Sequence, residues 1–580
     1  MHDIVIRGGR IADGSGSALR TGDVAIDGDR IAAVGTVEGR GRREIDADGL
    51  LVAPGWVDVH THYDGQVTWD PEVSPSGWHG VTTVVVGNCG VGFAPVRSEE
   101  RDWVIQLMEG VEDIPGTALA EGMSWNWQSF PQYLDEVERL TRVMDVAAMV
   151  PHGALRAFVL GCDRNNAEAG DEELSLMAKL TAEAVDAGAV GFSTTRTLAH
   201  MAKDGQPAAG TFAAAQEMLA IGEALGGKGR RVFSVVTDHL LGSKGEEEFR
   251  WMAEVSKLGG IPVTYMVIDV PFTPGGWRVA FDRGLACNRD GAWLVPQVAG
   301  KPASLMVGWE STYHLFSGHE HYQPLAALPL GERVQRLRDP EIRRAILEEP
   351  LSFTNAFVGI LHSQLMNGNL FQLGDPPDYE PPRERSVAAL AAARGVPAHE
   401  LAYDLMLEQD GRELLYTPLL GYTDGDMDAL RTLLAHPSSV LGLGDGGAHV
   451  GFICDGSLPS FMLTHWARDR SRGETLPIEH VVHLQTERTA RLFGFEDRGT
   501  LAPGYLADVN VVDFDGLTLG PVEFAYDLPA GGKRLVQGAS GYQATIKRGA
   551  VVREEDHFTG ERPGILLRGP QPGPGAVRSS

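Results

Sequence analysis

Gly55-Trp-Val-Asp-Val-His60-Thr-His62-Tyr-Asp64 places two histidines two residues apart at the end of an apolar run that is typical of a buried β-strand. Because side chains alternate across a strand, His60 and His62 share one face, with Asp58 one layer below them. Two imidazoles at the carboxyl end of a parallel strand provide half of a tetrahedral metal site. We therefore predict that this stretch forms the first strand of a parallel barrel and begins a metal centre.

The His-x-His spacing is informative only in its context. A chain with 18 histidines in 580 residues is expected to hold about 0.6 such pairs by chance. A second pair, His319-Glu-His321, lies in a polar stretch with no strand before it. We interpret that second pair as solvent-exposed loop residues, and the first pair as ligands.

The composition of the chain limits the classes of molecule that we expect it to bind. The chain is 43% hydrophobic and 22% charged, as globular proteins are, and its net charge is −28. That charge disfavours nucleic acids and anionic membranes, because both bind basic surfaces. No segment has the pattern of a membrane span or a signal peptide. We expect a cytoplasmic protein with a small-molecule substrate, and a homo-oligomer as the default assembly.

The two ends of the chain have the same kind of sequence pattern. Residues 1–53 and 496–560 hold short β-strand patterns separated by Gly and Asp turns, without a long helical pattern. We predict that both ends pair into one small β-sandwich. Residues 561–580 are rich in Gly and Pro and are interpreted as a C-terminal tail or strapping arm.

Residues 54–495 alternate apolar strand patterns with helical ones, which favours a TIM barrel over an open sheet. Helices are expected near 171–187, 211–225 and 246–257. The interval of about 299–438, after the seventh strand, is interpreted as an insertion that forms a lid or pocket wall. The eight strands are predicted near 56–61, 82–86, 143–150, 189–193, 231–236, 261–268, 292–298 and 439–445.

Chemically active residues are expected where barrel strands end. The second strand ends in Asn88-Cys89-Gly90, and a thiolate is a strong Zn²⁺ ligand. The eighth ends in Gly442-Leu-Gly-Asp445-Gly-Gly, where a carboxylate among glycines can bind metal or move protons. The chain has four cysteines far apart in sequence, which favours reduced thiols over disulfides. Cys89 alone would be a buried apolar residue, but its position beside the His-x-His pair makes it a candidate ligand.

The third strand ends in Pro151-His152-Gly-Ala-Leu-Arg156. Arg156 can hold a substrate carboxylate with two hydrogen bonds, and His152 lies beside it. An equally good interpretation is structural, with Arg156 in an ion pair and His152 in a loop hydrogen bond.

Four motifs together repeat a known pattern: Pro54-Gly-Trp-Val-Asp-Val-His60-Thr-His62, Asn88-Cys89-Gly90, His152-Gly153 and Gly499-Thr-Leu-Ala-Pro-Gly-Tyr-Leu-Ala-Asp508. They closely resemble the amidohydrolase superfamily, in its N-acyl-D-amino-acid deacylase (D-aminoacylase-like) branch, over nearly the whole chain. The resemblance implies a distorted TIM barrel with a β-sandwich from both chain ends. It also implies that His60 and His62 bind metal, that Cys89 replaces the carboxylated lysine found elsewhere in the superfamily, and that Asp445 is the aspartate of the last strand.

The sequence departs from this family pattern at two ligand positions. After the fifth strand, Asp238 stands where a histidine is expected, and His239 follows one place later. In the sixth strand Tyr265 stands where the second histidine is expected, which leaves it a substrate-binding candidate. A slip of one residue turns a side chain to the opposite face of a strand. One metal ion is therefore favoured over two. Asp238, His239 and His449 are further candidates as ligands or acid/base groups.

The leading hypothesis is a metal-dependent hydrolase of a C–N bond in an amide, a cyclic amide or a related small molecule. Zn²⁺ would be held by the histidine pair, Cys89 and Asp445 in some combination, with Asp445 as the proton carrier. One alternative is a deaminase or ring-opening amidohydrolase, because related barrels use similar ligands on different substrates. Another alternative is a catalytically silent binding protein with a degenerate metal site.

Overall fold

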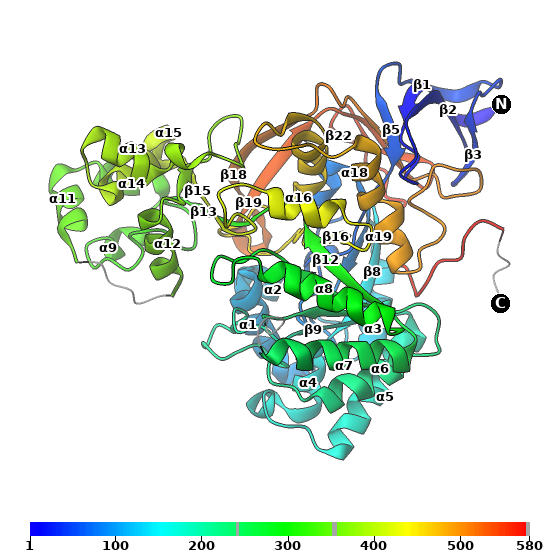
Figure 1. Cartoon of the computed structure of the whole chain (residues 1–580), viewed down its shortest axis with the longest axis horizontal. Coiled ribbons are helices and arrows are strands. Elements are labelled where there is room, and N and C mark those ends of the chain that lie inside the picture. The colour runs from blue at the N-terminus through cyan, green and yellow to red at the C-terminus, as the bar shows by residue number, and fades with distance from the viewer. Residues whose placement is uncertain (239–242, 351–355, 576–580) are drawn as a thin grey trace.

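The computed structural model describes residues 1–238, 243–350 and 356–575. Its centre is a sheet of eight parallel strands, each paired with the next one along the chain, which form a barrel (Figure 1). The predicted (β/α)8 barrel is confirmed. Its strands are β6 (Trp56–Asp58), β7 (Val81–Val86), β8 (Asp145–Pro151), β9 (Gly191–Thr195), β10 (Val232–Val236), β11 (Val263–Val267), β12 (Leu294–Ala299) and β16 (Val440–Gly442).

Helices cover the outside of the barrel, and the predicted helix 171–187 coincides with α5 (Asp171–Ala187). That helix begins after Gly170 with three acidic residues in its first turn, which interact favourably with the helix dipole. The other helices of this layer are α4 (His152–Leu160), α6 (Ala215–Leu225), α7 (Ser243–Gly259), α8 (Gly276–Arg289), α16 (Asp428–Ala435), α18 (Ile478–Gln485) and α19 (Glu487–Leu492). The long crossover from β7 to β8 adds α1 (Arg101–Glu112), α2 (Gly116–Gly122) and α3 (Phe130–Arg139), and α17 (Leu458–Phe461) leads into a π-helix over Met462–Asp469.

The barrel closes beyond the ends of its first and last strands. The amide of Asp445 donates to the carbonyl of His60 at 3.0 Å, and the amide of His62 donates to the carbonyl of Gly446 at 2.8 Å. A parallel bridge joins Thr61 to Gly446. The first and eighth strands therefore meet at the level of the predicted metal ligands.

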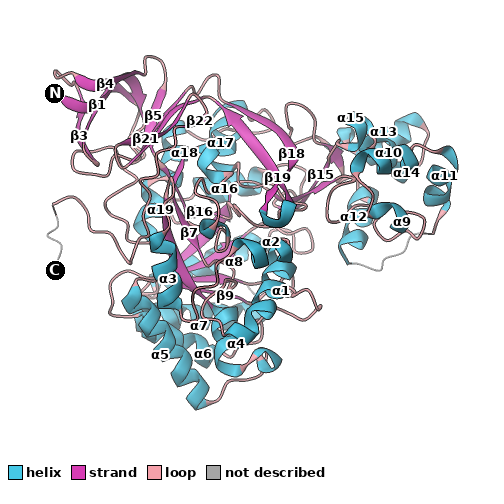
Figure 2. Ribbon diagram, turned by 180° about the vertical axis from the view of Figure 1, so that it is seen from behind, coloured by secondary structure: helices cyan, strands magenta, loops and turns pink. Residues whose placement is uncertain are grey.

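Both chain ends contribute to one nine-stranded sheet beside the barrel, as Figure 2 shows from behind. The N-terminal β5 pairs with the C-terminal β17, so the two ends are joined directly. The predicted pairing of the ends is thereby confirmed. The strands are β1 (His2–Ile11), β2 (Arg20–Asp27), β3 (Arg30–Gly35), β4 (Gly41–Asp46), β5 (Leu51–Pro54), β17 (Val509–Val512), β20 (Tyr542–Lys547), β21 (Ala550–Glu554) and β22 (His557–Phe558), with a separate hairpin of β18 (Thr518–Leu528) and β19 (Gly532–Ser540).

A buried cluster of charges joins this sheet to the barrel. Asp145, at the start of β8, accepts from Arg498 at 2.6 Å and from Lys547 at 2.9 Å. Lys547 also pairs with Asp508 at 2.7 Å, and all four side chains are at most 2% exposed. Burial opposes the ionised carboxylate, but Lys547 and Arg498 outweigh it and hold the pKa of Asp145 below its usual value. The late Asp508 of the sequence motif is thus part of the joint between the two parts of the fold.

Residues between β12 and β16 form a lobe that projects to one side of the barrel (Figure 1). Three strands, β13 (Ala303–Val307), β14 (Phe371–Gln372) and β15 (Leu415–Leu420), carry a set of short helices with its own apolar core around Trp309 and Tyr403. The helices are α9 (Gln323–Ala326), α10 (Leu330–Leu337), α11 (Pro340–Glu348), α12 (Ala356–Met366), α13 (Val387–Arg394), α14 (Ala398–Met406) and α15 (Glu408–Gly411).

The Gly- and Pro-rich C-terminal segment runs along the amino-terminal end of the barrel. The amide of Leu567 donates to the carbonyl of Val146 at 2.7 Å, and Gln571 bridges to Phe495. Leu567 is 1% exposed and belongs to the apolar cluster at that end. Residues 564–571 therefore act as a strap across this end of the barrel. None of the described helices is long and apolar enough to cross a lipid bilayer.

The joint between barrel and sheet can be tested with Asp145→Asn. The variant leaves Arg498 and Lys547 buried without their shared carboxylate, and we expect the free energy of unfolding to fall by about 3–5 kcal/mol. Urea unfolding measures this. Glu183→Gln removes half of an exposed pair with Lys179 and should change the free energy by less than about 1 kcal/mol. Equal losses in both variants would contradict a special role for the buried cluster.

Candidate metal centre

Four predicted ligands meet at the carboxyl end of the barrel. His60 and His62 follow β6, Cys89 follows β7 and Asp445 follows β16. His60 Nε2 lies 3.3 Å from Cys89 Sγ and 3.4 Å from Asp445 Oδ1, and His62 Nε2 lies 3.7 Å from the same oxygen. In a tetrahedral zinc site, neighbouring ligand atoms are about 3.3–3.8 Å apart, given zinc–ligand bonds of about 2.0–2.3 Å. The spacing of these atoms matches that geometry.

The donor set is compact and buried. Among the described residues, one group of His, Cys, Asp or Glu side chains has all its ligand atoms within 4.8 Å of one another, and its members are His60, His62 and Cys89. These three side chains are at most 6% exposed, whereas the Asp445 side chain is 20% exposed. Asp445 therefore lies on the side from which a substrate can approach.

Each histidine of the pair has a side-chain oxygen close to its Nδ1. His60 Nδ1 bonds Gln297 Oε1 at 2.8 Å, and His62 Nδ1 lies 3.3 Å from Glu112 Oε1. With Nδ1 carrying the proton, Nε2 of each ring presents its lone pair to the ligand group. Burial, opposed by the bond to Gln297, lowers the pKa of His60 to about 4, so the ring is neutral at neutral pH. Neutral imidazole is the form that binds metal.

The acidic groups of the centre fit a divalent cation. Burial, then repulsion from Glu112 and Asp445, raises the pKa of the Cys89 thiol well above its usual value. Burial, then repulsion from Asp455 and Asp58, raises the pKa of Asp445 in the same way. Among the described residues, neither oxygen of the buried Glu112 carboxylate has a hydrogen-bond donor. A metal cation supplies the positive charge that stabilises such groups in their ionised forms.

Backbone geometry also marks the site. Cys89, Asp445 and His449 are non-glycine residues with φ of 52°, 41° and 50°, in the left-handed region. Such conformations cost about 1–3 kcal/mol each and persist where the surroundings hold them, often at functional sites. At Cys89 and Asp445 this backbone turns the side chain towards the ligand group.

Three further residues belong to this region and were not predicted from the sequence. Gln297 lies near the end of β12, so the strand-end rule applied to that strand would have found it. Glu112 ends α1 in the crossover after β7, where no motif marks it. His200 bonds Thr195 Oγ1 through Nδ1 at 2.9 Å, and burial with the neighbouring His60 lowers its pKa to about 4. The predicted His449 lies beside Glu112, with Nε2 3.4 Å from Oε2.

The sequence itself matches a known family on this fold. Residues 43–553 match the amidohydrolase family. The chain belongs to the amidohydrolase family. It is therefore a hydrolase that acts on C–N bonds other than peptide bonds, in the D-aminoacylase-like branch.

Relatives and solved structures agree with this assignment. The chain is 26% identical to a D-aminoacylase of Alcaligenes xylosoxydans xylosoxydans over 97% of each chain. A solved D-aminoacylase with a binuclear metal centre superposes with a TM-score of 0.63, at 23% identity, over 98% of this chain and 100% of that chain. An N-acyl-D-glutamate deacylase from Bordetella bronchiseptica, solved with zinc and a phosphonate inhibitor, gives a TM-score of 0.60 at 22% identity, over 98% and 99%.

Two further residues of the predicted site, Asp238 and Tyr265, contact other parts of the structure. Asp238 accepts from Thr197 Oγ1 and the Leu198 amide, and so holds the loop after β9. Tyr265 points outward from β11, against Phe249 of α7 and Gly284 of α8. The expectation that Tyr265 contacts substrate is corrected by this orientation, which strand alternation dictates. His239 lies outside the described residues.

The structure also favours the structural interpretation of Arg156 and His152. Arg156 pairs with the Glu217 carboxylate of α6 and donates to the carbonyl of Asn165 at 2.8 Å. His152 Nε2 bonds the same carboxylate at 2.6 Å, and its Nδ1 bonds Thr194 Oγ1 at 2.8 Å. Both side chains are at most 1% exposed. The proposed clamp on a substrate carboxylate is therefore corrected: Arg156 faces the helical layer.

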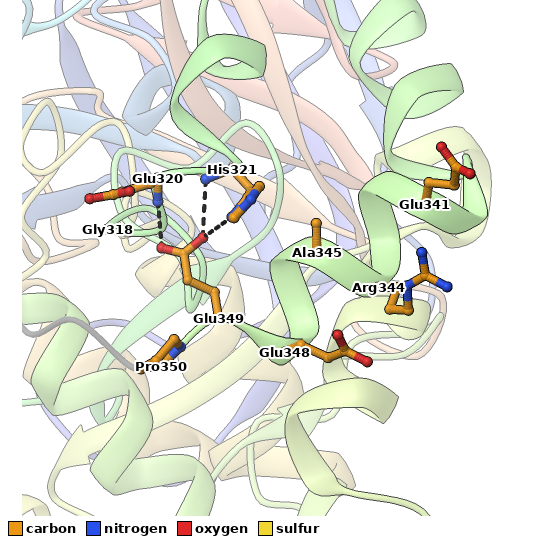
Figure 3. A pocket seen from close by; sticks show the side chains of 9 residues that line it. All are labelled: Gly318, Glu320, His321, Glu341, Arg344, Ala345, Glu348, Glu349 and Pro350. Carbon is orange, nitrogen blue, oxygen red and sulfur yellow. Dashed lines mark hydrogen bonds and ion pairs between the residues drawn. The ribbon is translucent and has the colours of Figure 1, made fainter.

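The second His-x-His pair is also placed, in the projecting lobe. His321 Nδ1 and the amides of Glu320 and His321 all contact the Glu349 carboxylate (Figure 3). These residues line a surface pocket of about 710 Å³ that contains none of the candidate ligands. His319 is 2% exposed and packs against Phe316, so the interpretation of His319 as a solvent-exposed residue is wrong.

Cys89→Ser should weaken zinc binding strongly, because serine offers no thiolate. We expect a loss of affinity larger than the about 10–100-fold that follows removal of a residue behind a ligand. Competition with a chromophoric chelator measures the affinity. Cys162→Ser is the matched control, because that thiol lies outside the centre. Wild-type affinity in Cys89→Ser would exclude the thiol as a ligand.

The Glu217 cluster predicts a pH dependence of stability. Burial raises the pKa of Glu217, but His152 and Arg156 outweigh it and lower the pKa to about 2. A carboxylate whose pKa is lower in the folded state stabilises the fold above its unfolded pKa of about 4.5, and loses this effect as pH falls towards 2. Urea unfolding from pH 6 to pH 3 should show a shallower decline in Glu217→Gln than in wild type. Glu223→Gln, an exposed position on the same helix, should retain the wild-type slope; parallel curves for all three proteins would contradict the assignment.

Proposed function

We propose that this amidohydrolase hydrolyses the amide bond of N-acyl-D-amino acids at a centre with one zinc ion. The observation that carries the proposal is the convergence of His60, His62, Cys89 and Asp445 at ligand spacing. The similarity to a D-aminoacylase over 97% of both chains supports the substrate class. The zinc in the solved N-acyl-D-glutamate deacylase supports the choice of metal.

The chemistry follows from the positions of these side chains. A bound zinc ion would lower the pKa of a water ligand and polarise the substrate carbonyl. His60, His62 and Cys89 would hold the ion from the buried side. Asp445 is the most exposed member of the group, so its carboxylate takes the proton from the attacking water and delivers it to the leaving nitrogen.

One ion is proposed rather than two because the two positions at which the family pattern expects further histidine ligands hold Asp238 and Tyr265 in this sequence. Asp238 holds a neighbouring loop and Tyr265 faces the helices. His449 is proposed as an acid/base group beside the centre rather than as a ligand, since its Nε2 faces Glu112. A cytoplasmic location and a homo-oligomeric assembly are further proposals, based on the sequence alone.

Asp445→Ala should abolish turnover while the protein stays folded. Loss of the proton carrier is expected to lower kcat/KM by about 10²–10⁴-fold. The assay uses a panel of N-acetyl-D- and N-acetyl-L-amino acids, with circular dichroism to check the fold. Asp48→Ala, in an exposed turn of the terminal sheet, is the matched control and should leave kcat/KM unchanged. Near-normal turnover in Asp445→Ala would contradict the mechanism.

The products separate the proposal from its alternatives. Release of a carboxylic acid and a free amino acid is expected, whereas released ammonia would indicate a deaminase. Turnover of cyclic amides alone would indicate a ring-opening enzyme. Wild-type protein that binds less than a small fraction of one zinc per chain, and hydrolyses nothing after zinc addition, would indicate a silent binding protein.

A further inference from the structure

Glu112 is a buried carboxylate that the proposed mechanism does not yet use. Its side chain is 1% exposed, and within the described part of the chain neither oxygen has a hydrogen-bond donor that meets ordinary geometry. Each oxygen instead faces one imidazole: Oε1 lies 3.3 Å from His62 Nδ1, and Oε2 lies 3.4 Å from His449 Nε2. Burying a carboxylate without hydrogen-bond donors costs free energy, so its position between two imidazole rings indicates a specific role.

The end of α1 holds this carboxylate in place from several sides. Val104, Leu107 and Met108 bury the apolar face of the helix. The amide of His449 donates to the carbonyl of Glu112, and Asp113 accepts from the Gly451 amide at 3.0 Å. The helix end, and with it the backbone of Glu112, is therefore attached to the loop that follows Asp445.

The positions of the two His62 nitrogens show whether Glu112 stands as a metal ligand or as a positioning residue. His62 Nε2 faces Asp445, whereas Nδ1 faces Glu112 on the opposite edge of the ring. A ring that binds metal through one nitrogen places the other nitrogen away from the ion. Glu112 thus stands behind His62, in the position of the carboxylates that orient metal-bound histidines.

We propose that Glu112 is a positioning residue that holds His62 towards the metal and His449 beside it through a single carboxylate. The inference rests on the proposed function for the identity of the metal site and goes beyond it in linking two imidazoles. Oε1 fixes the proton of His62 on Nδ1. Oε2 faces His449 Nε2 at 3.4 Å, which favours the proton on that nitrogen and leaves the Nδ1 lone pair of the ring for proton transfer.

Zinc affinity tests the first half of the proposal without any assay of turnover. We expect the zinc dissociation constant, measured by chelator competition, to rise about 10–100-fold in Glu112→Ala. Glu112→Gln keeps one oxygen acceptor and should recover part of that loss. Glu109→Gln changes a half-buried residue on the same helix that pairs with Lys203 instead of facing the centre, and this variant should bind zinc as wild type does. His449→Ala leaves the carboxylate behind His62 and should also keep the wild-type constant.

Kinetics test the second half. If His449 acts in the position that Glu112 gives it, then Glu112→Gln and His449→Ala each lower kcat. The double variant should then lose less activity than the product of the two single losses, because the two residues act as one unit. Strictly multiplicative losses would overturn the link between Glu112 and His449.

Other outcomes have defined meanings. Wild-type zinc affinity in folded Glu112→Ala would overturn the positioning role, and complete loss of zinc, as in His62→Ala, would make Glu112 a ligand instead. A wild-type protein that binds zinc but hydrolyses no N-acyl-D-amino acid would refute the proposed function, while the order of zinc affinities would still decide the role of Glu112. A wild-type protein that binds no zinc would overturn both.

Discussion

The structure depends on the pair of backbone hydrogen bonds that closes the barrel between its first and last strands. The carbonyl of His60 accepts from Asp445, and the amide of His62 donates to Gly446. In a sheet the backbone groups lie in the plane and the side chains stand perpendicular to it. Once these in-plane bonds form, both imidazoles must point to the same face, and Asp445 must lie next to them. The hydrogen bonds that close the barrel therefore also bring the candidate ligands together.

Strained backbone completes what closure begins. Strand geometry alone would not turn Cys89 and Asp445 into the ligand group, because each lies three residues past its strand. Both adopt φ values in the left-handed region. These values are sterically unfavourable for residues other than glycine, so the surrounding packing must hold them. Gly444 and Gly446 allow the close contacts here, since a Cβ at either would meet Asp58 or Tyr63 at 2.3–2.5 Å. Glycine is thus needed at these positions because a side chain would clash, and not only because glycine is flexible.

The parts that the sequence predicted are those governed by local periodicity. Strand alternation and strand ends identified the barrel and the four candidate ligands, because both rules need only neighbours in the chain. Glu112 could not be found this way: it belongs to a crossover helix, and only tertiary packing brings it to His62. The side-chain directions of Tyr265 and Arg156 could not be found from the sequence for a related reason. The rule locates the end of a strand or helix, but a shift of one residue decides whether the side chain faces the barrel or the helices.

Electrostatics connects the centre to the stability of the whole barrel. The charged joint at the opposite end, around Asp145, satisfies its carboxylate with two cations. At the metal centre, Cys89, Asp445 and Glu112 repel one another, and burial raises the pKa of each. Ionising these groups without a cation would oppose the barrel closure that brings them together. Metal binding and folding must therefore favour one another, because the ion stabilises the arrangement that the closing hydrogen bonds impose.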